Sequence, residues 1–188
     1  VPGFEHLFAS QAPMTGLRVE LYRREVRRPR PRYESLFEPL EPFPEGELDR
    51  FRIEPESGKA EGVELFVQGR SGSRIDWWVN YAYATTEDVI DGRKVPRQID
   101  QPHTLNADVN VHLSRQWDLN LAWRFHTGWR TTPVFLEERE DEDGETELVP
   151  VLGPLNSQQL PDYHRLDARI SRKWHVGRGQ LTFFVDAQ

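Results

Sequence analysis

Alternation of apolar and polar residues is the feature of this chain that most constrains its fold. The alternation is clearest over His103–Leu113, where leucine, alanine and valine occupy every second position between asparagine, aspartate and histidine. After a short turn, the same two-residue period continues over Leu119–His126. Because successive side chains of a β-strand point to opposite faces, each segment predicts a strand with one apolar and one polar face.

The same period recurs elsewhere, whereas helical periodicity is weak throughout the chain. The further segments are Leu17–Tyr22, Val63–Gln68, Asp76–Tyr83, Leu166–Ser171 and Leu181–Asp186, with a less regular one at Phe4–Phe8. We therefore expect about eight antiparallel strands, each near the roughly 9–11 residues that a tilted membrane-spanning strand requires.

The connections between these segments alternate in length. Short turns are expected at Ser10–Gly16, Arg70–Arg74, Ser114–Trp117 and His175–Gly179, and long loops at Arg27–Ala60, Thr86–Pro102 and Arg130–Tyr163. Strict alternation places every short turn at one end of the sheet and every long loop at the other. This asymmetry is typical of outer-membrane β-barrels.

Composition excludes several classes of protein. No stretch reaches the roughly 18 consecutive apolar residues of a helical membrane span. The net charge of -7 has no basic stripe, which argues against nucleic acid as a partner. The chain has no cysteine, so disulfides, thiolate metal sites and cysteine nucleophiles are excluded. No serine has an activating motif, and we expect no enzymatic activity and no catalytic residues.

Several phrases resemble the late barrel strands of TonB-dependent outer-membrane receptors. They are Trp77–Ala84, Asp100–Asn106, His126–Pro133, Leu160–Asp167 and Phe183–Asp186, and they occur in the order found in that family. The resemblance implies an all-β fold: residues 1–188 are a segment of an antiparallel up-and-down transmembrane β-barrel. About eight strands of a barrel of about 22 would be present, without the plug domain or the final strands.

The resemblance also implies function and location. The chain would be a wall segment of an active transporter in the Gram-negative outer membrane, importing a ferric siderophore, another metal chelate or an oligosaccharide. Its partners would be outer-membrane lipid and lipopolysaccharide, the imported substrate, and the plug domain and TonB in the full-length protein. No cofactor is expected.

Polar members of the repeat predict a network on the lumen side of the wall. Its expected members are Glu20, Glu64, Asn80, Asp108, Asn110, Arg124, Asp167 and Arg169, and Arg124 is expected to pair with Asp167 or Asp108. Substrate-binding candidates at the outer rim and lumen are Arg124, His126, Trp129 and Arg130.

Two charged segments can be interpreted either as ligand sites or as ordinary solvated loops. Arg27–Arg32 is either an anchor for lipopolysaccharide phosphates or a charged loop base, and Asp141–Glu145 with nearby glutamates is more typical of a solvated loop than of a calcium site. No metal ligand set is expected among the histidines. Trp77, Tyr83, Phe125, Trp129 and Trp174 suit aromatic girdles at the membrane boundaries.

Two alternatives share the same pattern. A soluble up-and-down barrel that binds a ligand would turn the apolar face inward, and a small outer-membrane barrel with a structural or adhesive role would close its first strand on its last.

Overall fold

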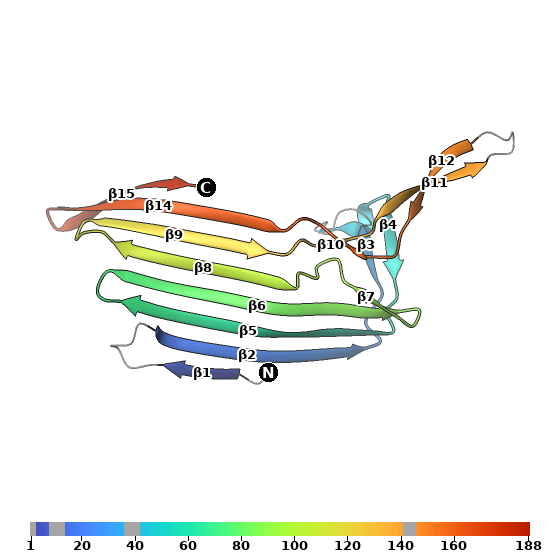
Figure 1. Ribbon diagram of the computed structural model, residues 1–188, viewed down its shortest axis with the longest axis horizontal. Helices are drawn as coiled ribbons and strands as arrows, with labels where there is room; N and C mark the ends of the chain where they lie inside the picture. Colours follow the sequence, from blue (N-terminus) through green and yellow to red (C-terminus); the bar gives the residue numbers. More distant parts are fainter. Residues whose placement is uncertain (1–2, 8–13, 36–41, 141–145) are drawn as a thin grey trace.

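The computed structural model describes residues 3–7, 14–35, 42–140 and 146–188, and it is all-β (Figure 1). Eight strands form one antiparallel sheet in the order β1-β2-β5-β6-β8-β9-β14-β15. Their bounds are β1 Gly3–Leu7, β2 Met14–Arg27, β5 Ser57–Ser71, β6 Ile75–Ile90, β8 His103–His112, β9 Trp117–His126, β14 Tyr163–Val176 and β15 Gly179–Ala187. The predicted number and direction of the strands are therefore confirmed.

Smaller elements lie within the long connections. The strand β7 (Arg93–Pro96) pairs with the end of β6, and β3 (Arg32–Ser35) pairs with β4 (Arg50–Ile53). A projecting hairpin is formed by β11 (Val134–Glu140) and β12 (Thr146–Leu152). The pair β10 (Arg130–Thr131) and β13 (Gln158–Gln159) and the 3-10 helix η1 (Pro44–Gly46) complete the described elements.

The connections divide between the two ends of the sheet as predicted. The turns that join β5 to β6, β8 to β9 and β14 to β15 lie at one end, which we call the turn end, and the long connections lie at the other, the loop end (Figure 1). The predicted loops were too long, because 57–60 and 86–90 continue β5 and β6. Strand length is correspondingly greater than expected, with 16 residues in β6.

Pairing register sorts the alternating residues into two faces. Directly opposed residues in an antiparallel sheet share a face, and Val109 lies opposite Leu121, which lies opposite Ala168. The apolar face comprises Leu17–Leu21, Val63–Val67, Trp77–Tyr83, Leu105–Val111, Leu119–Phe125, Leu166–Ile170 and Leu181–Val185, each at alternate positions. The residues between them form the polar face.

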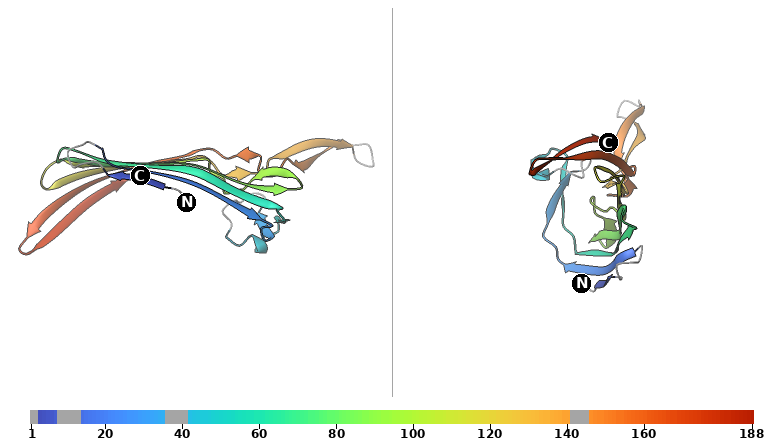
Figure 2. Two further views of the ribbon diagram at one scale, coloured as in Figure 1. Left: turned by 90° about the horizontal axis from the view of Figure 1, so that it is seen from below. Right: turned by 90° about the vertical axis from the view of Figure 1, so that its left-hand side faces the viewer.

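The sheet is curved but open (Figure 2). The strand β1 pairs only with β2 and β15 only with β14, so the first and last strands lie at opposite edges. Closure of the first strand on the last, which a complete small barrel requires, does not occur. The described strands therefore form a sheet that is not closed into a barrel.

The apolar face has no covering layer in the described part of the chain. Among the described residues, Ile53 is the only buried aliphatic or aromatic residue larger than alanine apart from Pro55, whereas Leu121 is 39% exposed, Leu166 62% and Phe183 59%. A soluble barrel buries such residues in a dry interior, and no interior of this kind is present. Among the described residues, no helix has the length and apolarity needed to cross a bilayer.

Candidate functional site

A hollow of about 590 Å³ lies at the loop end of the polar face. We call it the loop-end hollow. Its lining comes from β8, β9, the segment before β10, the segment after β13 and the first residue of β14. The lining residues are Thr104, Asn106, Arg124, Phe125, His126, Gly128, Trp129, Leu160, Pro161 and Tyr163. Three of the four predicted substrate-binding residues, Arg124, His126 and Trp129, therefore meet in one place.

Three rings are in contact in this hollow. The ring of His126 is stacked on that of Tyr163, with the centroids 4.8 Å apart and an interplanar angle of 14°, and it is tilted by 34° to the ring of Trp129 at 5.7 Å. Tyr163 lies directly opposite His126 in the pairing of β14 with β9, which explains the close stack. Nδ1 of His126 lies 2.8 Å from the side-chain nitrogen of Gln101, so the imidazole is held in position.

Gly128 allows the backbone of 160–161 to approach closely beside these rings. A Cβ at this position would lie 1.8 Å from the carbonyl oxygen of Leu160, so only glycine fits. The amide of Leu160 donates to the carbonyl oxygen of Trp129 at 2.8 Å, and the side chain of Gln159 donates to that of Gly128 at 3.1 Å. These bonds fix the backbone that carries Trp129.

The two candidate arginines have different environments. Arg130 lies outside the hollow lining, and its guanidinium is 3.2 Å from Asp100, a buried carboxylate that also accepts a hydrogen bond from the amide of Thr86. Arg130 therefore holds the loops together. Arg124 makes no ion pair with any residue that the structure describes, so its guanidinium is available to an anionic or polar ligand.

The predicted lumen network lies on one face. Register places all eight of its members on the polar face: Glu20, Glu64, Asn80, Asp108, Asn110, Arg124, Asp167 and Arg169. The expected pair of Arg124 with Asp167 or Asp108 is not formed. Each carboxylate has a different partner. Asp167 binds Arg165, two residues away on β14, at 2.7 Å, and Asp108 on β8 accepts a hydrogen bond from Asn120 on β9 at 3.0 Å.

Neighbouring polar residues extend this network across the sheet. Arg169 forms two hydrogen bonds to Asp186 of β15, at 2.6 and 3.1 Å. At the turn end, His112 lies 2.6 Å from Asp118 and 3.1 Å from Asp76, and Lys173 binds Asp118 at 2.7 Å. Side chains from adjacent strands thus neutralise one another on a face that carries both charges.

A buried aspartate organises the loop end. Asp88 is 1% exposed and binds Arg32 at 2.6 Å and Arg97 at 2.7 Å, which joins β3 to β6 and to the segment after β7. Burial acts to lower the pKa of Arg32, but the charges of Glu34 and Asp88 outweigh it and raise that pKa above its ordinary value. Sequence reasoning missed this cluster because Asp88 falls in a predicted loop.

On two strands the apolar face ends at or near aromatic residues. On β9 it extends from Trp117 to Phe125, and on β6 it extends from Ile75, next to Trp77, to Tyr83. Four of the five predicted girdle residues, Trp77, Tyr83, Phe125 and Trp174, share this face. The placement of Trp129 on the girdle was wrong, because the strand ends at His126 and Trp129 contacts that residue in the loop-end hollow.

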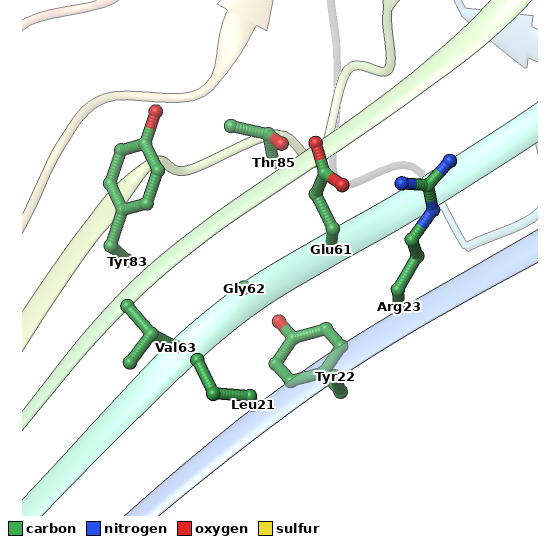
Figure 3. Close-up of a pocket in the computed structure, with 8 residues that line it drawn as sticks. All are labelled: Leu21, Tyr22, Arg23, Glu61, Gly62, Val63, Tyr83 and Thr85. Atoms are coloured by element: carbon green, nitrogen blue, oxygen red, sulfur yellow. The ribbon is translucent and has the colours of Figure 1, made fainter. Parts of the chain in front are cut away.

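A second hollow, of about 520 Å³, crosses the loop-end border of the apolar face (Figure 3). Leu21, Val63 and Tyr83 line its apolar part. Arg23 and Glu61 line the part nearer the loops, and Arg23 is paired with Glu25. On β2 and β5 the same face changes from an aliphatic to a charged side chain within two residues, from Leu21 to Arg23 and from Val63 to Glu61. The border of the apolar face is therefore sharp on these strands.

The described residues offer no metal site, since none of them form a group of three histidine, cysteine, aspartate or glutamate side chains able to hold an ion. The acidic segment Asp141–Glu145 lies outside the described residues. Arg27, Arg28 and Arg30 are exposed, whereas Arg32 is occupied by Glu34 and Asp88. The lining of the loop-end hollow offers aromatic rings and polar side chains, among them the guanidinium of Arg124.

Comparison of the chain with models of known families, with curated proteins and with solved structures finds no match. The class that the structure itself defines is an open, antiparallel all-β sheet with one apolar and one polar face.

Proposed function

We propose that the chain is a wall segment of an outer-membrane active transporter, with its apolar face against lipid and its polar face toward the lumen. The observation that carries this proposal is the uncovered apolar face, which continues across neighbouring strands and has aromatic residues near its borders on β6 and β9. Exposing such a surface to water is unfavourable, whereas contact with acyl chains removes it from water. The asymmetry of turns and loops supports the same orientation, with the turn end periplasmic.

The height of the apolar face supports a bilayer as its environment. Trp117 and Phe125 are eight residues apart on β9, which corresponds to about 27 Å along a strand. A tilt of about 40° reduces this to about 20 Å across the bilayer, close to the apolar band of about 25 Å in outer-membrane barrels. The other strands of a closed barrel, the plug domain and TonB belong to the proposal for the full-length protein.

The loop-end hollow supports an import function. Its stacked rings offer flat apolar surface, and Arg124, Asn106 and Thr104 offer polar groups beside it. A ferric siderophore, another metal chelate or an oligosaccharide presents both kinds of surface. Exposed arginines at Arg27–Arg30 would face lipopolysaccharide phosphates above the outer leaflet.

Uptake measurements on the full-length protein test this function. Cells expressing it are offered labelled ferric siderophores, metal chelates and oligosaccharides, with and without active TonB. We expect TonB-dependent uptake of one class, and Trp129→Ala and Arg124→Gln each to weaken binding of that substrate about tenfold or more, since each removes a stacking or charge-assisted contact. Arg139→Gln, on the exposed strand β11, is the control and should bind normally.

A protein that is folded in buffer without detergent, or uptake independent of TonB, contradicts the proposal. The first result favours the soluble binding module.

A further inference from the structure

Arg172 is a cation on the apolar face. It lies opposite Trp117 of β9 on one side and Phe183 of β15 on the other, two residues before Trp174. The strands β8, β9, β14 and β15 are described in full, and their apolar face carries no other arginine, lysine, aspartate or glutamate. A lone cation on such a face is expensive unless a group outside the chain compensates it.

Two indole rings hold this guanidinium in place. Its central carbon lies 4.7 Å from the ring centre of Trp174 and 5.2 Å from that of Trp117. Stacking of this kind orients the planar group and leaves its edge free for hydrogen bonds. The Nε atom of Arg172 is buried and has no hydrogen-bond partner.

The charged neighbours of Arg172 are engaged on the opposite face. Lys173 and Asp118 bind each other at 2.7 Å, and Asp118 also contacts His112. No carboxylate forms an ion pair with Arg172 in the part of the chain that the structure describes. Besides the two indole rings, the described residues supply no group that balances this charge, so an anion from outside the chain is the partner to consider.

We infer that Arg172, held between Trp117 and Trp174, binds the phosphate of a glycerophospholipid in the leaflet at the turn end. The position fits this ligand, because Trp117 marks the turn-end border of the apolar face, where head groups meet acyl chains. A planar guanidinium forms two parallel hydrogen bonds to phosphate. Phe183, opposite Arg172, and Val185, one step nearer the centre of the sheet, offer apolar surface to the acyl chains. The inference rests on the membrane position proposed above.

Lipid binding by the full-length protein in neutral detergent tests the inference. Native mass spectrometry measures the dissociation constants of phosphatidylglycerol, of diacylglycerol, which lacks phosphate, and of inorganic phosphate, which lacks acyl chains. We expect the wild type to bind phosphatidylglycerol in preference to both others. Arg172→Met should weaken that binding about tenfold or more, the loss expected for a charge-assisted contact.

Two further variants complete the test. Arg172→Lys keeps the charge but not the planar fork, and it should bind phosphatidylglycerol several-fold more weakly than the wild type. Arg115→Gln removes an exposed cation from the adjacent turn and should bind as the wild type does. If Arg172→Met does not fold, Arg172→Lys decides, and unchanged binding in that variant overturns the inference.

Insertion into phospholipid vesicles separates this inference from the proposed function. If the wild type does not insert, the membrane position fails and the lipid site fails with it. If all variants insert and bind phosphatidylglycerol equally, or if inorganic phosphate binds as tightly as the lipid, only the lipid site is refuted.

Discussion

Replacing Leu121 with arginine places a charge in the centre of the apolar face. Leu121 lies four residues from both Trp117 and Phe125, opposite Val109 and Ala168, and is 39% exposed. An arginine facing lipid near the bilayer midplane destabilises a membrane barrel by about 2–4 kcal/mol, and near an interface by about 0–1 kcal/mol. We therefore expect Leu121→Arg to lower the free energy of unfolding by about 2–4 kcal/mol.

Two matched variants separate lipid from other environments. Asn120→Arg introduces the same side chain one residue away on the polar face and should change the free energy by less than about 1 kcal/mol. Ile75→Arg lies on the apolar face at the turn-end border and should cost about 0–1 kcal/mol. Denaturant titration of the full-length protein folded into phospholipid vesicles measures all three. Equal costs for Leu121→Arg and Asn120→Arg, or no cost for Leu121→Arg, would refute the reasoning.

Three further substitutions test the loop end and the sheet. Asp88→Asn removes the charge of a buried carboxylate between two arginines and should lower the local free energy of unfolding by about 3 kcal/mol or more. Hydrogen exchange around β3 and β7 should become faster. Exposed Lys94→Gln is the control and should leave exchange unchanged. Gly62→Ala places a Cβ 2.6 Å from a backbone oxygen of β6 and should destabilise the protein by about 1–3 kcal/mol in denaturant titration, while Gly46→Ala, with open space around it, should not. Gly128→Ala should reduce substrate affinity without reducing insertion into vesicles, because the clash is with Leu160 in the hollow lining; unchanged affinity contradicts that role of Gly128.

The division of residues between two faces was predictable from sequence. The two-residue period of segments such as Leu105–Val111 and Leu119–Phe125 is a local property, and the observed register leaves it intact across the sheet. Part of the strand order also followed, since short turns force β5 to pair with β6, β8 with β9 and β14 with β15. The pairs across the long connections agree with the expected up-and-down order. The ends of β5 and β6 were missed because 57–61 and 85–88 contain no large apolar residue to mark the two-residue period.

The loop-end contacts were not predictable, because they join residues far apart in sequence. Asp100 and Arg130 are 30 residues apart, and Arg32 and Asp88 are 56 apart. The small pairs β3–β4 and β10–β13 have two to four residues per strand, too few for a period to be recognised. Tyr163 was missed as a site residue, although an aromatic residue at the first position of a strand after a long loop is a usable signal.

Collision accessibility along β9 tests the orientation of the sheet most directly. The chain has no cysteine, so single cysteines at 117–126 can carry spin labels without background from this segment. In the full-length protein reconstituted into vesicles, labels at 119, 121 and 123 should collide with oxygen, which dissolves in lipid. Labels at 118, 120 and 122 should instead collide with a polar nickel chelate or be shielded from both. Uniform access along the strand, or shielding of 119, 121 and 123 from oxygen, would contradict contact between the apolar face and acyl chains.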